Sequence, residues 1–422
     1  MRQFFVVFHR YIGLVMVLFL VVAGSTGTML AFYDELEALL HPKVMVVPAP
    51  PNQAMLPPLV LATLVEKRYP NAVLNRIPLH QEAGKPMRFF LQPAPGVPAD
   101  SLQNNEIFVH PYTGEVLAER KWGDISQGMI NLMPFIYRLH FSLAVDTIGR
   151  YVFGIIALLW TMDCFVGAFL TLPQRQKKPK QASLNQRIHA SKAWLSRWKK
   201  SWHVRWGSGA YKINFDLHRA GGLWLWAMLF VYAWSSVAFN LTEIYRPVMT
   251  YLFASQQTEY HLPPVIPAPV KPQIDRPAAL ILGQTFMQKA ATAMRFNIHY
   301  EDRLTYVPNK NIYLYSVNSS LDVSEKTAST KVVFDANSGH LLARYLPTGV
   351  ASGNTITEWL LALHTARVWG LFMQVFVCLM GAAVTGLSIT GVYIWWKKRK
   401  AKRVAKQQSS RQAMRHQPTA AV

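Results

Sequence analysis

Residues 11 to 33 read YIGLVMVLFLVVAGSTGTMLAFY and contain no charged side chain. The stretch is longer than the roughly 20 residues that an α-helix needs to cross about 30 Å of hydrocarbon. A helix in the core of a soluble protein rarely stays uncharged for so long. We therefore expect a membrane protein, with this stretch as its first membrane-spanning helix.

Three later stretches share this character: residues 151–174, 220–242 and 368–396. Asp163 is the one charged residue within them. Of the 422 residues, 51% are hydrophobic and 16% are charged, a composition that excludes a disordered or wholly soluble protein. The two cysteines, Cys164 and Cys378, each lie inside an expected span and provide neither a disulfide framework nor a Cys-x-x-Cys site.

The formal charge of +22 is concentrated on one side of this arrangement. Three segments expected on the same face hold 23 of the 44 Lys and Arg residues and one of the 22 Asp and Glu residues: 1–10, 173–219 and 397–422. Cytoplasmic segments of membrane proteins carry such a basic excess. Both termini are therefore expected in the cytoplasm. Because the basic runs flank apolar helices, we expect them to contact anionic membrane lipids and not nucleic acid.

The sequence contains an internal repeat. Three patterns recur in the same order: HRYIGL at 9–14 and HRAGGL at 218–223, PYTGEVLAER at 111–120 and DANSGHLLAR at 335–344, and LH at 139–140 and 363–364. A glycine, Gly167 or Gly391, follows 27 residues after the histidine of each LH pair. Each half reads helix, outer domain, helix. We therefore expect two parallel repeats, related by an axis along the membrane normal.

Four histidines stand at equivalent entrances of the expected spans: His9 with His218 on the cytoplasmic side, and His140 with His364 on the outer side. Histidine also suits a half-wet interface, which is the structural alternative. Two such coincidences are better explained by ligation, because two facing imidazoles can bind one iron from opposite sides of a flat macrocycle. Zinc needs three or four ligands at each site. The sequence therefore predicts two bis-histidine haems.

Four arginines lie beside these histidines: Arg10, Arg219, Arg138 and Arg367. They are candidates for binding haem propionates, and an anchoring role at the membrane interface is an equal alternative. Asp163 is a separate candidate, because a carboxylate inside a membrane segment is costly and by default functional. It is expected either to hydrogen-bond a partner helix or to relay protons.

The fold class that follows is a membrane α-helical protein with four transmembrane helices in two parallel repeats and two small periplasmic α+β modules. The expected parts are transmembrane helix 1 (1–33), module 1 (34–130), the outer haem segment with transmembrane helix 2 (131–174), a basic cytoplasmic loop (175–215), transmembrane helix 3 (216–242), module 2 (243–355), the outer haem segment with transmembrane helix 4 (356–396) and a basic cytoplasmic tail (397–422).

Each module is expected to contain one helix and three strands, joined to the preceding span by a Pro-rich linker. In module 1 these are a helix at 59–67 and strands at 72–79, 87–92 and 106–109, after the linker 48–51. In module 2 they are a helix at 278–293 and strands at 295–300, 311–317 and 331–335, after the linker 263–269.

The remaining motifs indicate packing, not catalysis. The small-residue stretches 24–28 and 381–386 allow close helix approach. No Gly-x-Gly-x-x-Gly follows a strand, and the cytoplasmic loop is too short for a dinucleotide domain, so the chain cannot by itself take hydride from a nicotinamide. The other nine histidines are expected on solvated surface. No side chain is assigned a catalytic role.

The repeated HR starts, the LH entrances and the ending Asp335-x-x-x-Gly339-x-x-Leu342 resemble the PepSY-associated transmembrane helix proteins. His110 stands where module 1 would have the corresponding aspartate. The family includes haem-containing ferric siderophore reductases of the bacterial inner membrane. The resemblance implies two haem b groups, a multi-pass protein of that membrane, and reduction of a ferric siderophore at the periplasmic face to release Fe(II).

The electron donor, a cytoplasmic reductase or a quinol, is not encoded in this chain. Three alternatives stay open at this point. They are a haem-free PepSY-type regulatory or binding membrane protein, a helper of a transporter, and a respiratory cytochrome b-like electron carrier.

Overall fold

The computed structural model describes residues 1–98, 100–174, 193–256 and 271–415. The chain forms two compact units. The helical unit comprises Met1–Thr28, Ile148–Leu241 and Leu379–Val422, and the mixed unit comprises Met29–Thr147 and Thr242–Cys378. Much of the expected cytoplasmic loop, the linker 263–269 and the end of the basic tail lie outside the described residues.

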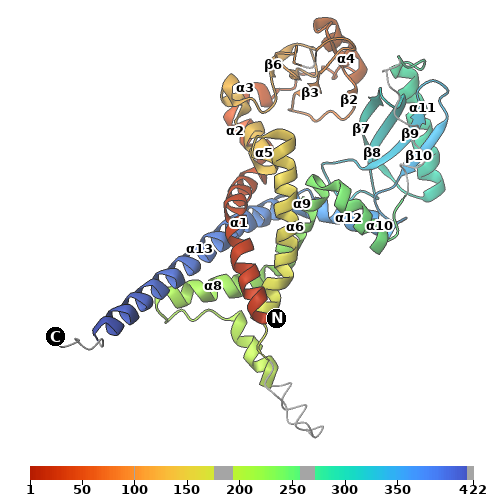
Figure 1. The fold of residues 1–422 in the computed structure, drawn as a ribbon. Coiled ribbons are helices and arrows are strands. Elements are labelled where there is room, and N and C mark those ends of the chain that lie inside the picture. The colour runs from red at the N-terminus through yellow and green to blue at the C-terminus, as the bar shows by residue number, and fades with distance from the viewer. Residues whose placement is uncertain (99, 175–192, 257–270, 416–422) are drawn as a thin grey trace. The chain divides into compact units, whose positions relative to one another are not determined.

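Three helices are long and apolar enough to cross a membrane: α1 (Arg2–Leu30), α6 (Asp146–Thr171) and α13 (Gly370–Arg415) (Figure 1). They cover the first, second and fourth expected spans. The described residues thus contain three candidate spans, or four if the bent pair of α8 and α9 counts as one.

The third expected span, over residues 216–242, is not a single helix. Helix α8 (Ala210–Trp224) and helix α9 (Trp226–Asn240) meet at Leu225 with a bend of 69°. The bend is local, because Leu225 leaves the helical region with φ −99° and ψ 2°. Helix α9 alone is about 22 Å long at 1.5 Å per residue, which is less than the roughly 30 Å of a hydrocarbon layer. Sequence periodicity does not detect a one-residue break of this kind.

The small-residue stretches in the helical unit do bring two helices together, as predicted. A Cβ atom on Gly24 of α1 would lie 2.7 Å from the backbone oxygen of Gly381 on α13, and a Cβ on Gly381 would lie 2.6 Å from the oxygen of Gly24. Both separations are shorter than any real contact of a Cβ atom. Each glycine is therefore required for backbone contact between the two helices.

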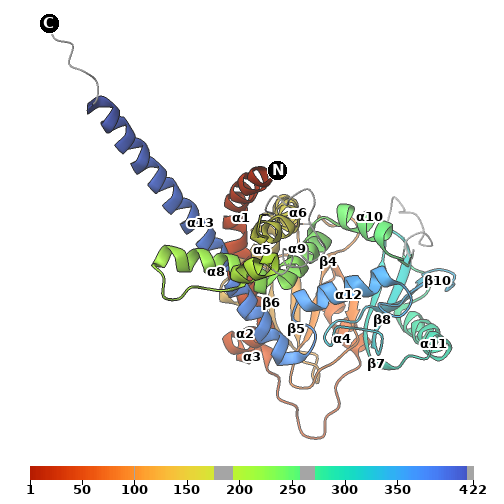
Figure 2. The same cartoon turned by 90° about the horizontal axis from the view of Figure 1, so that it is seen from below.

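The mixed unit contains a five-stranded antiparallel sheet in the order β10, β9, β8, β7, β2. Figure 2 shows its strands β7, β8 and β10 near helix α11. Its strands are β2 (Arg76–Pro78), β7 (Ile298–Val307), β8 (Ile312–Ser319), β9 (Thr330–Asp335) and β10 (Leu341–Tyr345). Helix α11 (Arg276–Met294) packs on this sheet so closely that a Cβ on Gly283 would lie 2.6 Å from Tyr315.

The first module supplies the edge strand of this sheet, which the sequence did not predict. Ile77 of β2 pairs with Leu304 of β7. The first module also contains helix α4 (Pro58–Arg68) and two small sheets. In one sheet β1 (Ala72–Val73) pairs with β4 (Gln92–Pro93), and in the other β5 (Glu106–Val109) lies between β3 (Met87–Phe90) and β6 (Val116–Arg120). One hydrophobic core contains Phe89 and Tyr313 from the two modules. The expected modules are therefore parts of one folded unit.

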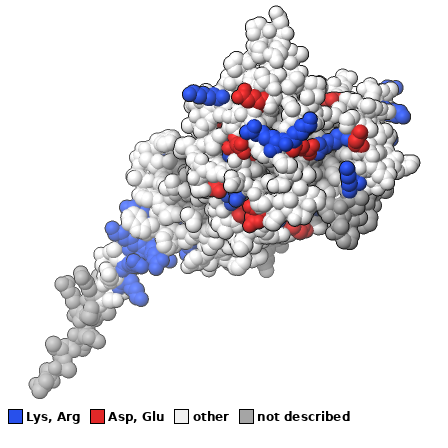
Figure 3. Space-filling model, turned by 90° about the horizontal axis from the view of Figure 1, so that it is seen from above, with Lys and Arg blue, Asp and Glu red and all other residues white. Residues whose placement is uncertain are grey.

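Short helices connect the sheets of the mixed unit with the long helices: α2 (Tyr33–Leu40), α3 (Pro42–Met45), α5 (Leu132–Ser142), α10 (Thr242–Leu252) and α12 (Ser352–His364). Acidic and basic side chains are interspersed over the mixed unit on the face that Figure 3 shows. In the exposed run from Lys397 to Arg403 on α13, every charged residue is Lys or Arg.

Candidate functional site

The first histidine pair, His9 and His218, lies in the helical unit. His9 is carried by α1 and His218 by α8, and their ring centres are 6.1 Å apart. The structure therefore brings together two residues separated by more than 200 positions, as the repeat predicted.

The second histidine pair, His140 and His364, lies in the mixed unit. His140 is near the end of α5, and His364 is the last residue of α12. Their ring centres are 6.2 Å apart. Both predicted pairings are thus present, each between two helices.

The ring separations fit one metal ion between each pair. A metal bonded to one nitrogen of each of two opposed imidazoles holds their centres about 6 to 6.5 Å apart, at roughly 2 Å per metal–nitrogen bond plus about 1.2 Å from nitrogen to ring centre. The stacked His80–Tyr300 pair is closer, at 4.0 Å, whereas edge-to-face packing without a metal also gives such distances, as between Tyr33 and Tyr137 at 6.4 Å. Among the residues that the structure describes, no group of three or more His, Cys, Asp or Glu side chains is placed to hold a metal. The candidate ligands are two pairs of imidazoles, and a bis-histidine haem needs one such pair.

Hydrogen bonds at Nδ1 orient both rings of the first histidine pair. The His9 Nδ1–H donates to the Asp163 carboxylate at 2.9 Å and 3.0 Å. The His218 Nδ1–H donates to the Leu387 carbonyl oxygen at 3.1 Å and lies 3.0 Å from Thr390 Oγ1. Because Nδ1 is engaged in both residues, Nε2 is the nitrogen left to bind a metal.

Two glycines lie against these rings. A Cβ on Gly167 of α6 would be 3.8 Å from Cε1 of His9, and a Cβ on Gly391 of α13 would be 3.3 Å from Cε1 of His218. These are the glycines that follow the two LH entrances at the same interval in the sequence. Equivalent glycines therefore pack against equivalent histidines.

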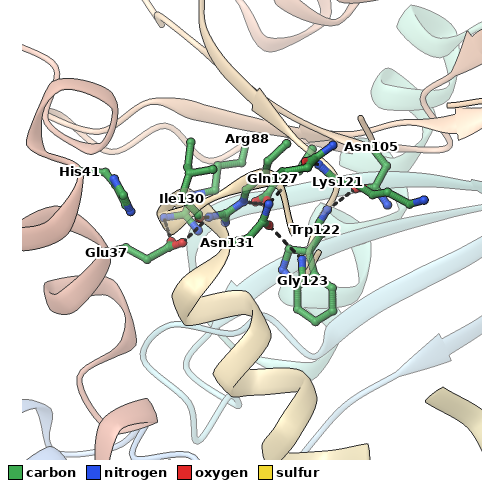
Figure 4. A network of polar contacts seen from close by, with 12 residues as sticks. Glu37, His41, Arg88, Asn105, Lys121, Trp122, Gly123, Gln127, Ile130 and Asn131 are labelled. Atoms are coloured by element: carbon green, nitrogen blue, oxygen red, sulfur yellow. Dashed lines mark hydrogen bonds and ion pairs between the residues drawn. The ribbon is translucent and has the colours of Figure 1, made fainter. Parts of the chain in front are cut away.

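A buried ionic cluster supports the segment that leads to His140 (Figure 4). Arg120, at the end of β6, bonds Glu37 of α2 through Nη1 at 2.7 Å and Glu106 of β5 through Nε at 2.6 Å. The three side chains are at most 1% exposed. Arg120 Nη1 also donates to the carbonyl oxygen of Ile130, two residues before α5 begins. The cluster therefore fixes α5 to the sheet of the first module.

Burial and mutual attraction oppose one another in this cluster, and burial raises the pKa of Glu106 in spite of its ion pair with Arg120. Burial acts to lower the pKa of Arg120, but Glu106 and Glu37 outweigh it and place that pKa above its usual value. Arg88 adds a second cation, with Nη2 3.0 Å from Glu37 Oε2. Arg120 is thus protonated at neutral pH.

Burial lowers the pKa of His364 to about 3, and the neighbouring His140 acts in the same direction. His364 is consequently neutral at pH 7. Metal binding requires an imidazole in its neutral form.

The four arginines predicted beside the histidines have different surroundings. Arg219 forms an ion pair with Asp216 at 2.9 Å, and Arg138 donates to Asp146 at 2.7 Å and to the Gly123 carbonyl at 3.0 Å. These partners favour the anchoring role for both residues. Arg10 is half-buried on α1 next to His9, and exposed Arg367 donates to Thr327.

The hydrogen bond of Asp163 to a partner helix, one of the two roles expected for it, is present, but the sequence did not identify His9 as the partner and did not predict the Arg120 cluster. The sequence did contain a signal for the role of Asp163. Asp163 stands four residues before Gly167, just as Leu387 stands four residues before Gly391. The cluster gave no signal, since its charges are far apart in the chain and look like ordinary surface residues. Of the other histidines, His41 and His299 make local hydrogen bonds in the mixed unit.

Several apolar helices of spanning length, combined with a folded sheet unit, define a multi-pass membrane protein. The chain belongs to the family described as the PepSY-associated TM region, whose sequence model matches residues 6–398. This confirms the family that the repeated motifs predicted. None of the curated proteins matches the chain.

Proposed function

We propose that this protein is a di-haem electron-transfer protein of the bacterial inner membrane that reduces a ferric siderophore at the periplasmic face. One observation carries the proposal: two histidine pairs at repeated positions each have the ring separation of a bis-histidine iron site. His9 with His218 and His140 with His364 would each hold one haem b. When bound, the haems would carry single electrons across the membrane.

The proposed topology has four spans in two parallel repeats and both termini in the cytoplasm. It is supported by the basic excess of the terminal and middle segments and by the exposed basic run of α13. An even number of spans requires α8 and α9 together to make the third. The matched contacts of Gly167 with His9 and Gly391 with His218 support the repeat.

The chain's own residues would bind and orient the two prosthetic groups. Asp163, Leu387 and Thr390 contact Nδ1 of the two rings of the first pair, which leaves Nε2 of each ring as the nitrogen that would bind the metal. For the second pair, Arg120 fixes the start of α5, which carries His140.

The proposed reaction adds one electron to the ferric ion of the chelate and gives Fe(II). Hard oxygen ligands of a siderophore hold the smaller, more highly charged Fe(III) far more strongly than Fe(II), so reduction would release the iron. The mixed unit, whose charges are interspersed, would face the periplasm and form the substrate site. A cytoplasmic reductase or a quinol would supply the electron.

The purified full-length protein is expected to contain two haems per chain. Its absorption spectrum should show a Soret band and, after dithionite, the sharp split bands of low-spin iron with two imidazole ligands. Pyridine haemochrome analysis against protein concentration gives the stoichiometry. A protein that binds no haem when expressed with excess haem would instead support the haem-free regulatory or transporter-helper alternatives.

A further inference from the structure

The two rings of the first histidine pair are held by matched positions that differ in charge. Asp163 lies four residues before Gly167 on α6, and Leu387 lies four residues before Gly391 on α13. The acceptor of the His9 Nδ1–H is the Asp163 carboxylate, and the acceptor of the His218 Nδ1–H is the backbone carbonyl of Leu387. The acceptor of each Nδ1–H therefore stands at a matched position of its helix, but only the acceptor of His9 is an anion.

Asp163 is itself deeply placed. It is 7% exposed and lies within the apolar helix α6, where a carboxylate is costly unless a specific partner compensates it. Both of its oxygens are within 3.0 Å of His9 Nδ1. The Asp163 carboxylate thus hydrogen-bonds His9 directly.

We propose that Asp163 is a positioning residue that lowers the midpoint potential of the iron bound by His9 and His218. This inference rests on the proposed function. A carboxylate that accepts the Nδ1–H makes the imidazole a more basic ligand. Its negative charge, at low local dielectric, also favours the ferric state, which carries one more positive charge than the ferrous state. A lower potential at this iron favours passing the electron on to an acceptor.

The test is Asp163→Asn, which keeps the shape and one oxygen acceptor but removes the charge. Potentiometric titration of the purified full-length variant, followed by its absorption spectrum, should show one haem with a raised midpoint potential and the other unchanged. Asp163→Glu, which keeps the charge, should leave both potentials close to those of the unaltered protein. Thr390→Val is the matched control, because it removes a neutral acceptor beside His218, and it should shift the same haem less than Asp163→Asn.

Each outcome decides the inference. Loss of the haem in Asp163→Asn but not in Asp163→Glu overturns the inference, since the charge would then be needed to hold the haem and not to tune its potential. Unchanged potentials in an Asp163→Asn protein with full haem content overturn the inference while leaving the proposed function intact. Loss of one haem in both variants also overturns it, since Asp163 would then be needed for assembly and not for tuning. Absence of haem from the unaltered protein is the separate result that removes the proposed function.

Discussion

Replacing His218 with alanine is expected to remove one of the two haems and leave the other spectrally intact. His364→Ala is expected to remove the other one. In the proposed function each pair would supply both protein ligands of one haem iron, so the loss of one imidazole would leave a single protein ligand. Haem content should fall from two to about one per chain in each variant, measured by pyridine haemochrome analysis and by the reduced spectrum.

The matched controls are His80→Ala and His299→Ala. His80 stacks on Tyr300, and His299 Nδ1 lies 3.0 Å from Asn318 Oδ1, so both make ordinary contacts within the mixed unit. They should keep two haems per chain. If His218→Ala and His364→Ala also keep two low-spin haems, the ligand assignment is wrong.

Arg120→Met is expected to destabilise the protein by about 3 to 5 kcal/mol, the range measured when one partner of a buried ion pair is removed. The variant would leave Glu37 and Glu106, each 1% exposed, without the cation that lies between them. It would also remove the donor to the Ile130 carbonyl. Unfolding of the full chain in detergent, followed by tryptophan fluorescence, should show a clearly lower midpoint temperature.

Lys85→Met is the control for this prediction. Lys85 forms its ion pair with Glu82 at the surface, where both side chains are 51% exposed. Exposed pairs of this kind contribute at most about 1 kcal/mol. A midpoint for Arg120→Met no lower than that for Lys85→Met would show that the buried cluster is not important for stability.

The features predicted from sequence are those with a periodic or repeated signal. Uncharged length predicted α1, α6 and α13, and the duplicated motifs predicted both histidine pairs. Small residues predicted the contact of Gly24 with Gly381.

The features that were missed depend on tertiary contacts. The bend at Leu225 involves one residue in an otherwise apolar run, which hydropathy averages away. The pairing of β2 with β7 joins segments more than 200 residues apart, and a three-residue strand carries little pattern of its own. Arg120 and Glu37 resemble surface charges in the sequence, and only the folded structure shows that they are buried.

The central claim, electron transfer to a ferric chelate, is tested most directly by stopped-flow mixing. Dithionite-reduced protein, freed of excess reductant, is mixed with a ferric hydroxamate siderophore and an Fe(II) trap. We predict that the haems reoxidise, that the trapped Fe(II) matches the electrons lost, and that the reaction slows in His364→Ala. Haem that stays reduced with every ferric chelate tested but reoxidises rapidly with a quinone would contradict the claim and indicate a respiratory electron carrier.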